Sequence, residues 1–276
     1  MNDARATEEG AGVSPALPSA SVILVRRAAD GFEVFMVRRP ASAAAFADVF
    51  VFPGGTVRRD DFLDLPAASE FTPDQALHEL TARGGTPPAS AALAIALWRA
   101  ALRELFEEAG VLLARDAWGQ TLRIPDDAAA HYAELRSALQ AGNLTLAEVL
   151  ASEHLALDYR ALRYFSHWIT PVYVPRRFDT RFFVAEMPDG QTAFHHQGES
   201  TEGVWIQPDE ALIRSSHGQF GIVFPTRMHL ERLSQHSTLE DLLTFAAEKS
   251  IRTVQPERPA PGERGSVVLA PEAAEW

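Results

Sequence analysis

The sequence predicts an α/β (α+β) fold, in which strands and helices follow one another along a chain of 276 residues. Three observations carry this prediction. β-branched and apolar residues fill 21–27 and 32–39, and Asp30-Gly31 between them forms a good hairpin turn. Strong helix formers occupy 91–106 with apolar residues at helical spacing, and strand character returns between 164 and 186. The length exceeds one average domain but suits a single domain with insertions.

A glycine loop follows the first two strands. The apolar run 49–51 leads into Phe52-Pro53-Gly54-Gly55, and glycines without a Cβ let a backbone carbonyl approach a metal or a phosphate closely. The next segment, about 62–88, contains one short helical pattern at 73–82 and then Gly-Gly and Pro-Pro pairs. We expect this segment to be an insertion between the loop and the long helix.

The long helix ends in a cluster of acids. Ser90 is a good N-cap, and Gly110 stands where a helix ends in a left-handed cap. Glu104, Glu107 and Glu108 follow the i, i+3, i+4 spacing, so they share one side of the helix at its negative end. A divalent cation such as Mg²⁺ would offset this repulsion, because it binds carboxylates and waters and leaves positions for phosphate oxygens. A solvated acidic face is the simpler alternative.

The remaining elements are expected in the following order along the chain. Helices at 126–140 and 144–155 cover the core within 125–157, strands occupy 164–174 and 181–186 around a basic loop at 175–181, and helices start at 208, 225 and 238. The domain is expected to span 19–254, with a disordered tail at 1–18 and a second tail at 255–276, in which 267–269 either adds an edge strand or dangles. His167 and four aromatic residues are expected to be core or cover residues rather than ligands: Trp98, Trp118, Tyr132 and Tyr159.

Composition excludes several classes of protein. The chain has no cysteine, which rules out disulfides and thiolate metal sites, and 46% hydrophobic with 22% charged residues is typical of a soluble globular protein. Its net charge of −12 disfavours a broad nucleic-acid or membrane surface, because both are polyanions. The start lacks a secretory signal and no run is long enough to span a bilayer, so we expect a cytoplasmic protein.

The glycine loop and the acidic helix together resemble the Nudix box. The family pattern is Gly, five residues, Glu, seven residues, then Arg-Glu-apolar-x-Glu-Glu-x-Gly-apolar, and 103–111 matches its second half at every specified position. The first half differs, because Asp61 stands at the glutamate position and the gap to Arg103 is far longer than seven residues. The resemblance implies a Nudix fold, a mixed β-sheet sandwiched between helices, with helical insertions before and after the Nudix helix. Whether Asp61 folds back to hold Arg103 stays open at this point.

A second resemblance narrows the assignment to a subgroup of the family. The segment 164–171, followed by Arg176-Arg177-Phe178-Asp179-Thr180, is similar to the acyl-coenzyme A diphosphatase subgroup of Nudix proteins, and the similarity covers about 20–245. The separate arginine signature of other coenzyme A Nudix enzymes is only partly present, since Arg39 fits but Ala44 and Asp48 replace an arginine and a glycine. The subgroup implies cleavage of CoA or acyl-CoA into adenosine 3',5'-bisphosphate and a phosphopantetheine product.

These resemblances assign roles to particular residues. The implied metal ligands for Mg²⁺ or Mn²⁺ are Glu104, Glu107, Glu108 and the carbonyl of Gly54. The implied catalytic base is Glu107 or a loop acid, either Glu199 at the subgroup spacing or Glu202 at the spacing of many other members. Arg103 is expected to orient the glutamates by ion pairing. The residues expected to contact substrate are Arg39, Gly55, Arg176 and Arg177.

Three functions follow as hypotheses. The first is metal-dependent hydrolysis of CoA-type diphosphates, in a monomer or a homodimer. The second is the same chemistry on NADH, ADP-ribose or a nucleotide sugar, and it is favoured if the 175–181 loop lies away from the acids. The third is a non-catalytic Nudix-fold module that binds a ligand, against which the complete acid set 103–108 argues, because a binder does not need charges that repel each other.

Overall fold

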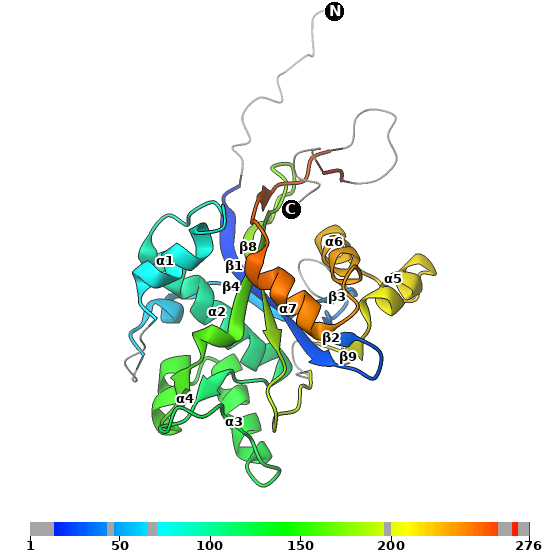
Figure 1. Cartoon of the computed structure of the whole chain (residues 1–276). Coiled ribbons are helices and arrows are strands. Elements are labelled where there is room, and N and C mark those ends of the chain that lie inside the picture. The colour runs from blue at the N-terminus through cyan, green and yellow to red at the C-terminus, as the bar shows by residue number, and fades with distance from the viewer. Residues whose placement is uncertain (1–13, 43–46, 66–70, 196–199, 259–266, 270–275) are drawn as a thin grey trace, which may run out of the picture.

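A mixed eight-stranded β-sheet forms the centre of the computed structural model, which describes residues 14–42, 47–65, 71–195, 200–258, 267–269 and 276 (Figure 1). The strand order is β10-β7-β8-β1-β2-β3, while β4 pairs with β1 and β9 pairs with β2. The strands are β1 Ala16–Arg27, β2 Phe32–Arg38, β3 Phe50–Val51, β4 Gly54–Thr56, β7 Leu162–Ile169, β8 Arg177–Glu186, β9 Glu202–Ile206 and β10 Thr253–Val254. The predicted α/β class with a mixed sheet is confirmed, since β1 pairs parallel with β8 and antiparallel with β2.

Helices cover both faces of the sheet (Figure 1). One side carries η1 Arg59–Phe62, α1 Pro73–Thr81, α2 Ala91–Ala109, α3 Ala129–Gln140, α4 Leu146–Ser152 and η2 Tyr159–Ala161, with the small β5 Ala114–Arg115 and β6 Ala156–Leu157 pair. The other side carries α5 Pro208–Ser216, α6 Phe224–Leu233 and α7 Leu239–Glu248. Among the described residues, no helix combines the length and apolar character needed to cross a bilayer.

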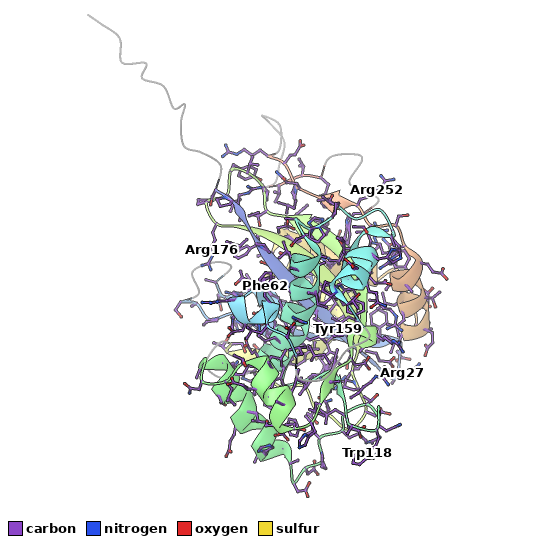
Figure 2. All side chains as sticks on the ribbon, turned by 90° about the vertical axis from the view of Figure 1, so that its left-hand side faces the viewer. Arg27, Phe62, Trp118, Tyr159, Arg176 and Arg252 are labelled. Atoms are coloured by element: carbon purple, nitrogen blue, oxygen red, sulfur yellow. The ribbon has the colours of Figure 1, made fainter. Side chains whose placement is uncertain are left out.

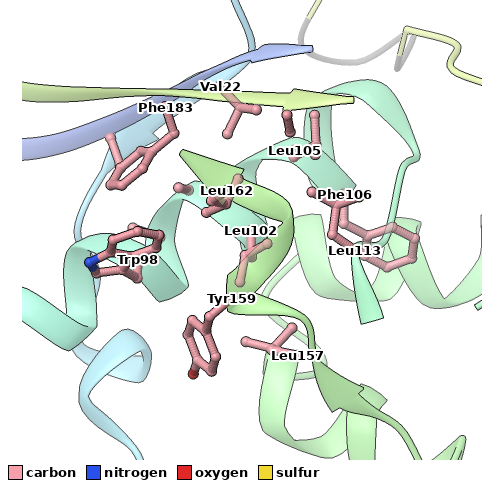
Figure 3. Close-up of a cluster of buried hydrophobic side chains, with 14 of the residues drawn as sticks. Val22, Trp98, Leu102, Leu105, Phe106, Leu113, Leu157, Tyr159, Leu162 and Phe183 are labelled. Atoms are coloured by element: carbon pink, nitrogen blue, oxygen red, sulfur yellow. The ribbon is translucent and has the colours of Figure 1, made fainter. Parts of the chain in front are cut away.

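Strand β1 contributes side chains to the cores on both faces of the sheet, because successive side chains of a strand point to opposite faces. Val22 and Leu24 join the core on the α2 side, whereas Ile23 and Val25 join the core beneath α6 and α7. On the α2 side, Trp98, Leu102 and Leu105 belong to the same buried cluster as Val22 and Phe183 of the sheet (Figure 3). The long helix is therefore held against the central strands along its whole apolar stripe.

Several boundaries differ from the sequence prediction. Strand β1 begins at Ala16, inside the expected 1–18 tail, because it pairs with β8 from Ala16 and Arg177 onward. For the same reason β8 begins at Arg177, so most of the expected 175–181 loop is strand, while β7 ends at Ile169 instead of 174. Helix α3 begins at Ala129 rather than 126, because Pro125 and Asp126 form turns. Helix α4 spans only Leu146–Ser152, because a Thr145 capping box starts it.

The expected C-terminal tail also contributes to the structure. Trp276 is only 3% exposed and packs edge-on against Trp168, with ring centroids 4.9 Å apart. Glu257 and Val268 form an isolated antiparallel bridge, so 267–269 is attached to the body of the protein. Among the described residues of this segment, 267–269 and Trp276 are thus attached to the body of the protein, and Trp276 completes the core on this side of the sheet.

The expectation of buried aromatics holds for three of the four residues. Trp98 and Tyr159 are buried and Tyr132 is half-buried. Trp118 contradicts the expectation, since it is 83% exposed on the turn between β5 and α3 and projects from the end of the molecule (Figure 2). His167 is buried and satisfied, because its ring nitrogens lie 2.8 Å from Thr253 Oγ1 and 2.5 Å from Asp179 Oδ1.

Candidate active site

The C-terminal half of α2 carries charged side chains into the interior. The helix starts at Ser90, whose Oγ accepts a hydrogen bond from Leu93 N, and it ends at Gly110 with a left-handed φ of 71°. Arg103, Glu104 and Glu107 are 2%, 4% and 0% exposed. Charges are almost never buried to this degree unless they are paired, so their partners define the site.

Arg103 is held by Asp61 in a two-pronged ion pair. Its Nε donates to Asp61 Oδ1 at 2.8 Å and its Nη2 donates to Oδ2 at 3.0 Å, while Nη2 also reaches the carbonyl of Thr56. This geometry settles the open question about Asp61, because the acid does fold back onto Arg103 across the insertion. Burial alone would lower the pKa of Arg103, but the Asp61 hydrogen bonds and the surrounding carboxylates raise it above its usual value.

The same guanidinium orients two of the glutamates. Arg103 Nη1 donates to Glu104 Oε1 at 2.6 Å and to Glu107 Oε2 at 3.1 Å. The expectation that Arg103 orients the acids by ion pairing therefore matches the observed contacts. Arg103 and Asp61 are both buried, and breaking such a buried ion pair by removing one partner typically costs about 3–5 kcal/mol.

The glycine loop is in direct contact with Glu104 and Glu108. Gly54 lies in β4, which pairs with β1, and its N–H donates to Glu108 Oε2 at 2.9 Å. A Cβ at Gly54 would lie 2.6 Å from the carbonyl oxygen of Ala20, and a Cβ at Gly55 would overlap the carboxylate of Glu104. The two glycines are therefore required for the close approach of β4 to both β1 and α2.

Glu107 is bonded to two arginines. Its Oε1 accepts a hydrogen bond from Arg58 Nη1 at 2.8 Å, in addition to the bond from Arg103. Burial and the charge of Glu104 nevertheless outweigh both arginines and raise the pKa of Glu107 to about 7. Burial likewise raises the pKa of Glu104 against the opposing charge of Arg103. Burial therefore dominates the pKa of both acids, although each of them is in contact with an arginine.

A cavity of about 940 Å³ opens beside these residues. Its polar wall includes Gly54, Gly55, Glu104 and Glu108, and its apolar wall includes four aromatic residues, Phe52, Trp168, Phe178 and Phe224. Such a combination of a few convergent polar groups with a large apolar surface is typical of a ligand site.

The structure brings some of the predicted substrate residues to this cavity. Arg39 and Arg176 line it, together with Gly55, and the Arg176 guanidinium lies 5.5 Å from the centre of the Phe178 ring. Arg177 does not line it, because this residue belongs to β8 and its buried guanidinium donates to the carbonyls of Thr170 and Ser14. The geometry therefore does not support Arg177 as a substrate contact.

The candidate loop acids are less informative. Glu202 begins β9 away from the cavity walls, and its exposed carboxylate lies 3.6 Å from Arg38 Nη1. Glu199 lies outside the described residues, and so does Ala44 of the coenzyme A signature. Both loop acids stay predictions as far as catalysis is concerned.

The sequence analysis missed two sets of contacts to Glu107, one from Arg58 and one from helix α3. Arg58 lines the cavity and binds Glu107, and its position within the Gly-to-Asp61 spacing of the motif could have indicated it. Arg136 and Gln140 of α3 both donate to the main-chain carbonyl of Glu107, at 2.8 and 2.6 Å. No local signal predicts the α3 contacts, because they join segments about thirty residues apart. The two side chains satisfy a main-chain carbonyl in the last turn of α2, and Arg136 places a cation at the negative end of that helix.

The acids suit a hard divalent cation by their chemistry. Glu104 and Glu108 offer carboxylate oxygens in the cavity wall, and the buried Glu107 is bonded to the same Arg103 guanidinium as Glu104. Within the described part of the chain, no three acidic or histidine side chains converge as a ready-made metal cluster. The reason is that Glu104 and Glu107 point at guanidinium groups while Glu108 points at Gly54 N–H.

Comparisons with known proteins identify the family of the chain. A family model described as the NUDT19 Nudix domain matches residues 10–233. The acyl-coenzyme A diphosphatase NUDT19 of Gallus gallus is 28% identical over 249 residues, covering 80% of this chain and 66% of that protein. The acyl-coenzyme A diphosphatase NUDT19 of Homo sapiens is 26% identical over 256 residues, covering 82% of this chain and 67% of that protein. The chain thus spans about two thirds of the length of these relatives.

A solved structure supports the fold. The crystal structure of a Nudix hydrolase from Alicyclobacillus acidocaldarius matches with a TM-score of 0.63 and 25% identity, covering 87% of this chain and 100% of that chain. The architecture inferred from the box motif is therefore confirmed by an independent comparison of coordinates.

Proposed function

The chain belongs to the NUDT19 Nudix domain family, and from this membership we propose that it is a metal-dependent hydrolase of a diphosphate linkage in CoA or acyl-CoA. The products would be adenosine 3',5'-bisphosphate and phosphopantetheine or its acyl derivative. The observation that carries the proposal is the buried Asp61–Arg103 pair, which holds Glu104 in the wall of a large cavity together with the buried Glu107. A binding module would not need this many mutually repelling acids in a fixed arrangement.

The proposed chemistry follows from the charge of the substrate. A diphosphate is surrounded by negative oxygens that repel an attacking water, so catalysis requires neutralisation and positioning. Mg²⁺ or Mn²⁺, held by Glu104, Glu107, Glu108 and the Gly54 carbonyl, would supply Lewis acidity and lower the pKa of a bound water. The protein's own contribution is to hold the carboxylates in a fixed arrangement through Arg103, Arg58 and the Gly54 N–H.

Different side chains would position the acids, accept the proton and bind the substrate phosphates. Arg103 keeps Glu104 and Glu107 in place through its bonds to Asp61, and it lies too deep to contact substrate. Glu107 or the loop acid Glu199 would accept the proton from the attacking water at a carboxylate oxygen. Arg39 and Arg176, which line the cavity, would bind phosphate groups of the substrate through their guanidinium planes.

The cavity favours a CoA-type substrate over smaller nucleotides. Arg176 shares the cavity with Glu104 and Glu108, so the basic segment after β7 does not lie away from the acids. Phe52, Trp168 and Phe224 offer an apolar wall for a part of the substrate that carries no charge, and the pantetheine arm and acyl chain are such a part. The names of the relatives from Gallus gallus and Homo sapiens support the same substrate class.

Mass spectrometry of reaction products tests the proposal. The protein would be incubated with Mg²⁺ or Mn²⁺ and a mixture of CoA, acyl-CoA, NADH, ADP-ribose, a nucleotide sugar and diadenosine polyphosphates. We expect adenosine bisphosphate chiefly from the CoA compounds. AMP from NADH or ADP-ribose instead would keep the hydrolysis and reject the substrate, and no product with either metal would favour the non-catalytic module.

Two further expectations belong to the same proposal, namely a cytoplasmic location and either a monomer or a homodimer in solution. Light scattering of the purified protein decides between the oligomeric states. Microscopy of a tagged chain in its own cells tests the location, and a signal confined to another compartment would reject it.

A further inference from the structure

Arg58 contacts the buried acids although its own side chain is partly exposed at the surface. Its side chain is 42% exposed and lines the cavity, whereas Arg103 is 2% exposed. Its guanidinium reaches inward, with Nη1 at 2.8 Å from Glu107 Oε1 and Nη2 at 3.8 Å from Glu104 Oε1. The arginine therefore bridges the two carboxylates that the proposed metal would use.

The backbone of Arg58 is fixed independently of its side chain. Its N–H donates to Asp61 Oδ2 at 2.7 Å, at the start of η1, and the same carboxylate holds Arg103. A change in the Arg58 side chain torsions can therefore move the guanidinium without disturbing the loop. Because the residue lines the cavity, a guanidinium that leaves the carboxylates would move into that space.

The charges of the buried groups favour such an exchange. In their ionised forms Asp61, Glu104 and Glu107 carry three negative charges, and Arg103 and Arg58 carry two positive charges, which leaves one negative charge uncompensated. A divalent ion in place of the Arg58 guanidinium would bring this sum to zero. Glu107 Oε1 would also be released as a ligand, while Glu104 Oε1 would keep its bond from Arg103 and lose only the nearby charge of Arg58.

We propose that Arg58 is an exchangeable internal cation, which neutralises Glu104 and Glu107 while no metal is bound and moves to the substrate diphosphate once a divalent ion takes those carboxylates. The second half of this inference rests on the proposed function. A guanidinium that leaves one pair of carboxylates is well suited to a diphosphate, because its planar donors match phosphate oxygens two at a time. Arg58 would thus couple metal loading to substrate binding.

Metal binding without substrate tests the first half. Mn²⁺ binding to the full-length protein can be followed by electron paramagnetic resonance of the free ion, for the wild type, Arg58→Gln, Arg58→Lys and the matched control Arg59→Gln. Arg59 is the exposed neighbour in η1 and loses the same charge. We expect Arg58→Gln to bind Mn²⁺ at least about threefold more tightly, because no internal cation competes, while Arg58→Lys and Arg59→Gln stay near wild type.

Stability in EDTA and binding of ADP complete the test. Without metal, Arg58→Gln should melt several degrees below Arg59→Gln, whereas with Mn²⁺ it should bind ADP about tenfold more weakly than that control. Unchanged or weaker Mn²⁺ binding by Arg58→Gln would overturn the exchange, and unchanged ADP binding would overturn the second role. Neither readout depends on turnover, so a protein that hydrolyses nothing yet shows tighter Mn²⁺ binding would reject the proposed function and keep the exchange. If Arg58→Gln does not fold, Arg58→Met, which also removes the charge, takes its place in the same comparison.

Discussion

Replacing Glu107 with Gln should stabilise the metal-free protein and abolish its activity. Glu107 is fully buried, and its pKa is raised from 4.5 to about 7 by burial and by the charge of Glu104. Each unit of such a shift corresponds to about 1.4 kcal/mol. Ionising Glu107 in the folded protein at pH 8 therefore costs up to about 3 kcal/mol, and glutamine, which cannot ionise, avoids this cost while it keeps the shape of the side chain.

The sign of the pH dependence follows from the direction of the shift. Between pH 4.5 and about 7 the folded state binds the Glu107 proton more tightly than the unfolded chain does, so this group loses stabilising effect as the pH rises through that window. The advantage of Glu107→Gln over wild type should thus be near zero at pH 4.5–5 and about 1–3 kcal/mol at pH 8, a shift of a few degrees in Tm.

Urea unfolding in EDTA at both pH values, with turnover measured in parallel, checks this reasoning. Turnover should fall by about 100-fold or more, because a metal ligand and a candidate base are lost together. Glu134→Gln, an exposed acid on α3, is the matched control and should change neither quantity. A Glu107→Gln variant that is less stable than wild type at pH 8 would show that Arg58 and Arg103 compensate the charge fully, and retained turnover would refute the assignment of the acid.

Three further substitutions test the rest of the site. Asp61→Asn should lower the free energy of unfolding by about 3–5 kcal/mol, because it breaks the buried ion pair between Asp61 and the Arg103 guanidinium. Asp60→Asn at the exposed neighbouring position should change the free energy of unfolding by less than about 0.5 kcal/mol. Equal effects of the two variants in urea titrations would contradict the buried pair. Gly55→Ala should reduce turnover by about tenfold or more and stability by about 1–3 kcal/mol, because its methyl group overlaps a glutamate carboxylate, and wild-type turnover would contradict this geometry. Trp276→Ala should cost about 3–5 kcal/mol in thermal unfolding, unlike Trp118→Ala at an 83% exposed position, and equal melting temperatures would show that the C-terminal residue is dispensable.

Local signals predicted the elements that carry the chemistry. Ser90 and Gly110 mark the two ends of α2, and the periodicity between them is strong, so both ends were predictable from adjacent residues. The hairpin of β1 and β2 was equally clear from its Asp30-Gly31 turn. The acid set of α2 could be placed on one side of the helix before any coordinates, because only the helical spacing was needed.

Long-range pairing determined what the sequence did not reveal. The start of β8 at Arg177 depends on its parallel partner Ala16, which lies about 160 residues away, and no local propensity encodes that register. Burial of Trp276 depends in the same way on Trp168. The inward position of the Arg58 side chain also could not be predicted, since its partner Glu107 lies 49 residues further along the chain.

The insertion between Asp61 and Arg103 shows why the motif survives a change in spacing. The family pattern places seven residues between these positions, whereas this chain places 41, residues 62–102. For a flexible connection the entropic cost of closure grows only with the logarithm of length, which gives roughly 1.6 kcal/mol for this extension. The insertion also contributes contacts of its own, because Ala76 and Leu80 of α1 are buried in the core beside α2. The Asp61–Arg103 pair depends on the local geometry of two buried groups and not on the chain between them, so a search that demands fixed spacing would overlook the acid that holds this site together.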